Sequence, residues 1–290
     1  MAFQALAEPT PLPNLRDSLH SVAEFVFSLG VNRSNVRIQA YRKFLDAISD
    51  DDSSLDPIIS MRLWREIHEF TWVLTVFMDN KFKPPTELLK RSLDGKPLEE
   101  YQDEAGRNFF LQLRAAIYFL RVGYKIELTS DCDVVAIRNR DRIFIECKRL
   151  YSEKKARDRV RQCYQQLETR LACADRRYKN LGLAWVDPSP AMQKHYFVYT
   201  AYSEAGARHA ARTDLSVFSK QWIAGAYEGN EKRIFAMILQ MVWPSWVAGT
   251  AGVLTGFTSL VIPGHRKTSI VGLWKSRKLL GEILSIEEIS

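Results

Sequence analysis

The sequence predicts an α/β fold in which a mixed β-sheet is flanked by helices and preceded by an N-terminal helical subdomain. Residues 15–98 carry apolar residues at helical spacing only. From residue 100 onward, helical patterns alternate with short β-branched and aromatic runs that are typical of strands. We therefore divide the chain into a helical part, residues 1–99, and an α/β part, residues 100–290.

Three helices are predicted in the N-terminal part. The first has an apolar stripe over residues 19–29 and stops at Gly30, the second has a stripe over residues 41–48, and the third covers residues 61–78. The acidic run before the third helix lacks the alternating ligands and the later bidentate glutamate of a calcium loop. These helices carry no catalytic motif, and we expect them to contact a partner protein.

In the α/β part, a long helix over about residues 100–122 precedes three strands. Gly123 ends this helix, and residues 124–128 form the first strand. Residues 130–150 then form two strands joined by a charged turn. A second helix and two further strands follow, over residues 154–174, 181–186 and 196–200.

Three charged residues converge in the predicted hairpin. Within residues 143–148, Glu146 and Lys148 point to the same side, because side chains along a strand alternate faces with period two. Asp133 on the preceding strand adds a second carboxylate if the strands pair. Charges in an apolar strand cost several kcal/mol, roughly, unless they bind each other or a ligand. Two carboxylates and an ammonium suit a hard divalent cation, such as Mg²⁺, and the phosphate that it would hold.

Two alternatives stay open at this hairpin. Asp131 lies two residues before Asp133 and shares its face, but we favour Asp133 because Val134 continues the strand directly from it. The three charges could also form a satisfied ion-pair network in a fold without catalysis. We favour an active site, because convergent charges in an apolar hairpin are costly to keep.

Positive charge gathers in and just after the hairpin. The chain has a net charge of +7, and residues 138–179 contain fourteen Lys and Arg against six Asp and Glu. Such a local field attracts polyanions, above all nucleic acid, although a solvated helix face is the simpler reading of any run of charges.

Cysteine usage indicates a reducing compartment. The four cysteines have neither the paired spacing of a zinc site nor the frame of a small disulfide-rich domain, and we expect them to be buried small side chains. The N-terminus lacks a basic leader followed by an apolar run, so no signal peptide is expected. We therefore expect a cytoplasmic protein.

Charges are absent between residues 234 and 262. Gln240 and Pro244 interrupt this run, and its ends are rich in β-branched and aromatic residues, which favours two buried strands over a membrane span. We expect strands near residues 235–242 and 254–262, joined by a Trp-rich loop. Its tryptophans, Trp243 and Trp246, suit core packing better than base stacking.

Over residues 109–186 the chain resembles the PD-(D/E)XK nuclease superfamily. In that family a helix precedes a hairpin that carries an aspartate and then Glu-x-Lys, and a further helix packs across the sheet. Glu-x-Lys alone arises by chance about once in a chain of this length, and Glu153-Lys154-Lys155 satisfies it a second time. The context of Asp133, the apolar strand and the Gly123-Tyr124 helix terminus carries the resemblance.

The resemblance implies a restriction-endonuclease-like fold and a metal-dependent endonuclease that prefers DNA, in restriction or defence. Asp133 and Glu146 would ligate Mg²⁺ or Mn²⁺, together with the carbonyl of Cys147. Lys148 would orient the attacking water and offset charge on the phosphate. Such enzymes often cut both strands as dimers, which makes a homodimer an expectation here.

Two further positions come from the same resemblance. Many relatives carry a glutamate on the helix before the hairpin, and that place falls here at Gln112, with Glu104 as an alternative from an earlier turn. Some relatives also carry a glutamine on the helix after Glu-x-Lys. Gln166 is nearest to that pattern, and Gln162 and Gln165 are alternatives.

Cations that follow the hairpin would contact the phosphate backbone, and such contacts position a nucleic acid without reading its sequence. They are Arg149, Lys154, Lys155, Arg157, Arg159 and Arg161. His265 and its basic neighbours are a further place for phosphate. A second hypothesis for the same fold is a catalytically inactive nucleic-acid-binding or regulatory module.

Overall fold

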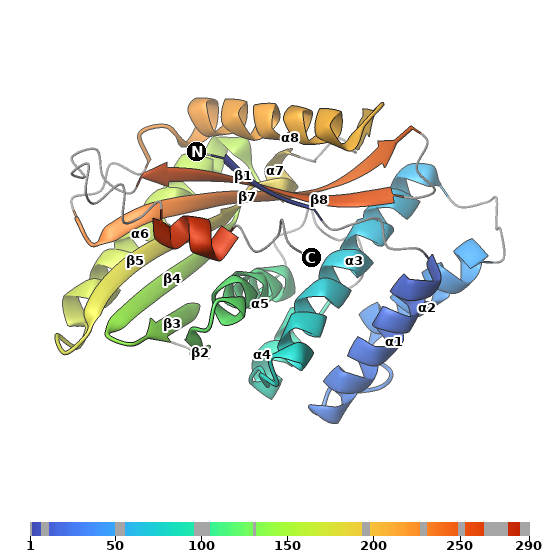
Figure 1. The fold of residues 1–290 in the computed structure, drawn as a ribbon, viewed down its shortest axis with the longest axis horizontal. Helices are drawn as coiled ribbons and strands as arrows, with labels where there is room; N and C mark the ends of the chain where they lie inside the picture. The colour runs from blue at the N-terminus through green and yellow to red at the C-terminus, as the bar shows by residue number, and fades with distance from the viewer. Residues whose placement is uncertain are drawn as a thin grey trace.

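The computed structural model describes residues 2–6, 12–49, 56–95, 105–129, 132–192, 198–226, 231–248, 253–263 and 278–284. Within these residues eight strands form one sheet (Figure 1). They are β1 (Ala2–Leu6), β2 (Lys125–Glu127), β3 (Val134–Arg138), β4 (Asp141–Arg149), β5 (Lys179–Asp187), β6 (Tyr199–Ala201), β7 (Ile234–Val247) and β8 (Val253–Pro263).

The sheet is mixed. Its order is β1-β8-β7-β5-β4-β3-β2, and β6 pairs with β7 outside this path. Strand β5 runs parallel to both β4 and β7, whereas the pairs at the two ends of the path are antiparallel. The parallel centre requires a crossover connection, and the helix between β4 and β5 provides it.

Helices cover both faces of the sheet. They are α1 (Leu12–Ser28), α2 (Val36–Ser49), α3 (Pro57–Asp79), α4 (Thr86–Ser92), α5 (Ala105–Arg121), α6 (Glu153–Cys173), α7 (Ser189–Met192) and α8 (Glu204–Phe218), with a π-helical turn over Ser219–Ile223 after α8. The predicted α/β class, a mixed sheet flanked by helices, is confirmed, and so are the three N-terminal helices and the helices on either side of the hairpin.

The alternation of β4 side chains divides the interior into two cores. Ile143 and Ile145 pack with the helices α1, α2, α3 and α5 on one face, and Phe144 packs with α6 and α8 on the other. This division follows directly from the period of two along the strand. It also places the charged side chains of Glu146 and Lys148 on the α6 side.

The N-terminal helices share their core with the sheet. Apolar residues of α1 and α3 belong to the same buried cluster as those of α5, β3 and β4. In addition, β1 pairs antiparallel with β8, so a strand from the start of the chain belongs to the sheet. The predicted boundary at residue 99 lies outside the described residues.

The expectation of a Trp-rich loop between the last two strands is wrong at its start. Strand β7 continues through Val247, and Trp243 pairs with Gly256 on β8. A side chain at position 256 would collide with the Trp243 indole, whose Nε1 donates to Thr258 Oγ1 at 2.9 Å. Trp243 is therefore a core residue, as expected, whereas the Trp246 side chain is exposed.

Two other sequence expectations are settled by the described residues. Among the helices that the structure describes, none is long and apolar enough to cross a membrane. Cys132, Cys147 and Cys163 are buried, but the expectation of burial is wrong for Cys173, which lies exposed at the last residue of α6.

A buried ion network ties α3 to α5 and the sheet. Arg114 on α5 contacts Asp187 at the end of β5 at 2.9 Å and Glu69 on α3 at 2.5 Å. Arg149 at the end of β4 also contacts Asp187, at 3.3 Å. Burial alone would raise the pKa of Asp187, but the two guanidinium groups and Ser189 outweigh it and lower the pKa to about 2. Asp187 therefore stays ionised at neutral pH.

We expect Arg114→Met to destabilise the fold by about 3–5 kcal/mol, because it leaves buried carboxylates without their shared cation. Chemical denaturation measures this change in the free energy of unfolding. The matched control is Lys90→Met, which removes an exposed ion pair to Glu87 at 3.2 Å and should cost less than about 1 kcal/mol. Equal effects of the two substitutions would contradict this view of the network.

Candidate active site

The register of the hairpin places Asp133 beside Glu146. Val134 pairs with Ile145 in the antiparallel ladder of β3 and β4. Asp133 directly precedes Val134, and Glu146 directly follows Ile145, so the two acidic residues lie just past the last pair of this ladder, where the charge of Glu146 acts on Asp133. Residues opposite each other on antiparallel strands share a face of the sheet. The structure thus brings together the two carboxylates that the sequence predicts to act jointly.

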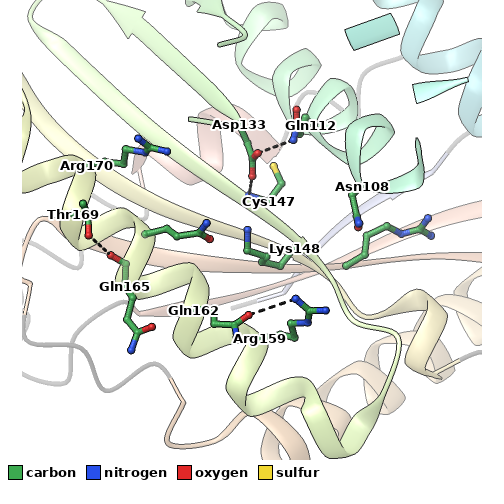
Figure 2. A pocket seen from close by; sticks show the side chains of 12 residues that line it. Asn108, Gln112, Asp133, Cys147, Lys148, Arg159, Gln162, Gln165, Thr169 and Arg170 are labelled. Atoms are coloured by element: carbon green, nitrogen blue, oxygen red, sulfur yellow. Dashed lines mark hydrogen bonds between the residues drawn. The ribbon is translucent and has the colours of Figure 1, made fainter. Parts of the chain in front are cut away.

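Two hydrogen bonds fix the carboxylate of Asp133. The Gln112 side chain on α5 donates from Nε2 to Asp133 Oδ1 at 2.6 Å, and the backbone N–H of Cys147 donates to Oδ2 at 2.7 Å (Figure 2). Gln112, the position that the family resemblance selects, therefore contacts Asp133. Its neutral amide holds the aspartate without adding the charge that a glutamate would bring.

Glu146 and Lys148 form an ion pair on the α6 side of the strand. Lys148 Nζ lies 2.8 Å from Glu146 Oε1, and the Glu146 side chain is only 5 % exposed. Burial by itself would lower the pKa of Lys148, but the Glu146 carboxylate outweighs this effect and raises the pKa. Lys148 is accordingly a protonated ammonium at neutral pH, and it donates hydrogen bonds rather than accepting protons.

The electrostatics of Asp133 differ from those of an exposed aspartate. Burial is the largest effect, and the neighbouring charge of Glu146 adds to it, so the pKa of Asp133 rises from 3.8 to about 6. The ammonium of Lys148 and the Cys147 N–H oppose this rise. The neighbouring charge of Glu146 therefore acts on Asp133 although Glu146 is itself paired with Lys148.

A cavity of about 550 Å³ opens above this group. Helices α5 and α6 and the end of β4 form its walls, and Lys148 projects between the helices (Figure 2). Its lining residues are Asn108, Gln112, Asp133, Cys147, Lys148, Arg149, Arg159, Gln162, Gln165, Gln166, Thr169 and Arg170. Gln166, which the family resemblance selects, lies in this wall together with both of its alternatives.

The predicted phosphate contacts fall into two groups. Arg149 and Arg159 line the cavity, and the Arg149 side chain is largely buried by its ion pair with Asp187. The remaining four are exposed on α6 outside the cavity lining: Lys154, Lys155, Arg157 and Arg161. Asp131, Glu104 and His265 lie outside the described residues.

Three cavity residues were not predicted from the sequence. Asn108 lies one helical turn before Gln112, and Thr169 and Arg170 lie one turn after Gln166. Their spacing of three and four residues from predicted positions is a usable sign, because such residues share one face of a helix. This spacing identifies cavity residues only when it is known which face of each helix is turned toward the hairpin.

Asp133 and Glu146 are the two carboxylates near each other at this place that could hold a cation. Among the residues that the structure describes, no group of three or more His, Cys, Asp or Glu side chains is placed to hold a metal. Mg²⁺ uses one or two carboxylates and keeps several waters. The carbonyl of Cys147 points to the same side of β4 as its N–H, toward Asp133, because a strand residue directs both groups to one neighbour.

Comparison with known proteins identified no similar protein. No protein-family model matches the chain, and no curated protein or solved structure matches it. The geometry of this site and the sequence resemblance are therefore the grounds on which a function can be assigned.

We expect Asp133→Asn to change how stability depends on pH. A buried carboxyl with a raised pKa contributes stability that is present below pH 3.8 and lost as the pH rises through about 6. The loss amounts to about 3 kcal/mol. An asparagine at this position cannot titrate, so the variant does not lose this stability as the pH rises. The difference in the free energy of unfolding, variant minus natural protein, should therefore increase by that amount between pH 4 and pH 7.

Urea denaturation at several pH values, without divalent cations, measures this difference. The control is Asp158→Asn, which alters an exposed aspartate of α6 and should leave the pH dependence unchanged. A stability difference between Asp133→Asn and the natural protein that is constant from pH 4 to pH 7 would contradict the raised pKa.

Proposed function

We propose that this protein is a metal-dependent nuclease that hydrolyses phosphodiester bonds, with DNA preferred over RNA. The observation that carries the proposal is the meeting of Asp133 and Lys148 at a cavity whose other charged side chains are cations, while the buried carboxylate of Glu146 pairs with Lys148 outside the lining. An anionic substrate enters such a cavity favourably. The preference for DNA, and a role in restriction or defence, come from the resemblance to the PD-(D/E)XK superfamily.

Asp133 and Glu146 would hold Mg²⁺ or Mn²⁺, with the Cys147 carbonyl as a third protein ligand. When bound, the cation would supply Lewis-acid stabilisation of the charge that develops on the phosphate. In the described structure Lys148 neutralises Glu146. A cation held by Glu146 would neutralise this carboxylate in place of Lys148. The Lys148 ammonium would then be available to the substrate.

Lys148 has the properties of an electrostatic catalyst. Its raised pKa keeps it protonated, and its side chain is partly exposed at the cavity. It can therefore donate hydrogen bonds to a phosphate oxygen or orient an attacking water, and a fixed donor aimed at developing charge is a large part of most rate enhancements. It cannot serve as the general base while it carries its proton.

Gln112 acts on the reaction through Asp133. Its 2.6 Å hydrogen bond orients the carboxylate, and α5, which carries it, is held by the Arg114 network. A glutamine adds no negative charge, so a cation here would be bound by fewer charges than in relatives with a glutamate at this place. We expect weaker metal binding as a consequence.

One observation favours the second candidate, a catalytically inactive nucleic-acid-binding or regulatory module. Both oxygens of Asp133 are hydrogen-bonded and Glu146 is paired with Lys148, so the charged groups are satisfied without a cation. Such a network is stable as a scaffold. In that case the basic face of α6 would bind nucleic acid, and the N-terminal helices would contact a partner protein.

Cleavage assays with labelled DNA and RNA in Mg²⁺ or Mn²⁺ separate the two candidates. We expect Lys148→Met and Asp133→Asn each to lower the cleavage rate by about 100-fold or more, the effect of losing one electrostatic group from an active site. Lys90→Met, which alters an exposed side chain of α4 outside the cavity, should cleave as the natural protein does.

Two outcomes of these assays would count against the proposed nuclease. Binding of nucleic acid by the natural protein with no cleavage in either metal supports the inactive module. Cleavage that persists unchanged in both site variants contradicts the proposed catalytic roles.

A further inference from the structure

Amide side chains line two walls of the cavity. Asn108 and Gln112 lie four residues apart on α5, and Gln162 and Gln166 lie four residues apart on α6. Residues at this spacing share one face of a helix. Figure 2 shows Asn108 and Gln112 on one side of Lys148 and Gln162 on the other. The cavity therefore has amide side chains on both walls, and the α6 wall also carries the cations Arg159 and Arg170.

The amides and the cations suit different parts of one ligand. In the lining of this cavity, four cations stand against the single carboxylate of Asp133, which favours a phosphate: Lys148, Arg149, Arg159 and Arg170. Asn and Gln side chains offer a donor and an acceptor side by side, which is the pattern that pairs with the edge of a nucleobase. A ligand with a phosphate and a base uses both sets of groups.

The size of the cavity restricts the form of that ligand. A volume of about 550 Å³ lies in the range of sites that enclose one small organic ligand. A base inside a double helix is stacked and paired, so it cannot enter a pocket unless it leaves the duplex. An unpaired nucleotide can place its phosphate at Lys148 and its base between the two helices.

Two of the amides are held only loosely by their neighbours. Asn108 Oδ1 accepts from the Tyr151 hydroxyl at 3.5 Å, and Gln162 Oε1 accepts from Arg159 at 3.5 Å. Hydrogen bonds of this length are weak and can be exchanged for a ligand at small cost. Gln112, in contrast, is committed to Asp133 through a 2.6 Å bond. Asn108 and Gln162 are therefore the pair suited to contact a base.

We propose that the cavity binds an unpaired nucleotide of a single strand, with the phosphate toward Lys148 and the base between Asn108 and Gln162. This inference rests on the proposed function for its ligand, nucleic acid, but it concerns binding and not cleavage. It assigns single-stranded or locally unpaired nucleic acid as the substrate class.

Fluorescence anisotropy with labelled twelve-nucleotide DNA strands and a matched duplex, in EDTA to prevent cleavage, tests the proposal. We expect tighter binding to the single strands than to the duplex. The double substitution Asn108→Ala with Gln162→Ala should weaken single-strand binding by about ten-fold, the effect of losing two modest hydrogen bonds, and leave duplex binding unchanged. Its far-ultraviolet circular dichroism and melting temperature establish that it folds.

The control variant is Gln221→Ala, which removes an exposed glutamine from a separate cavity beside α8 and should not change binding. Equal or tighter binding of the duplex, single-strand binding that is unchanged in the double variant, or no binding of either form overturns the proposal. If the protein cleaves nucleic acid but does not prefer single strands, the proposed function stands and this inference is wrong. If it prefers single strands but does not cleave, this inference stands and the proposed function is wrong.

Discussion

The antiparallel register of β3 on β4 is the constraint on which the candidate site depends. Pairing of Val134 with Ile145 leaves Asp133 and Glu146 as neighbours at the end of the ladder, where the ladder opens toward α5 and α6. A shift of one residue would turn every side chain of the strand to the other face, which would send Glu146 and Lys148 into the apolar core beneath α5. That shift is disfavoured because it would bury these two charges in an apolar core without their partners.

The buried ion network connects the end of β4 in this hairpin to α5 and α3. Asp187 holds Arg149, the residue after Lys148, and the same carboxylate holds Arg114 of α5, two residues after Gln112. Glu69 extends the network to α3. The N-terminal helices therefore pack onto the sheet and also fix the helix whose amide orients Asp133. The helical part of the chain therefore has a structural role at the site.

The sequence predicted the elements better than their packing. The hairpin, α5 and α6 follow from local periodicity, and the convergence of Asp133, Glu146 and Lys148 follows from strand alternation. Strand β1 and helix α4 were missed, because short segments of mixed composition gain their structure from neighbours. Helix α8 was also missed, although its fifteen residues and the cap at Ser203 are local signals. Pro244 suggested the end of a strand, but the indole of Trp243 fits over Gly256 and β7 continues. The amide walls depend on how α5 faces α6, which no local pattern specifies.

The central claim is that two carboxylates on adjacent strands share one cation. A crystal structure of the protein soaked in Mn²⁺, with anomalous scattering recorded to locate the metal, tests this most directly. We expect a peak within about 2.5 Å of carboxylate oxygens from both Asp133 and Glu146, with the Lys148 ammonium moved away from Glu146. A structure without a peak at this place, and with the Lys148–Glu146 ion pair unchanged at saturating Mn²⁺, would contradict the account.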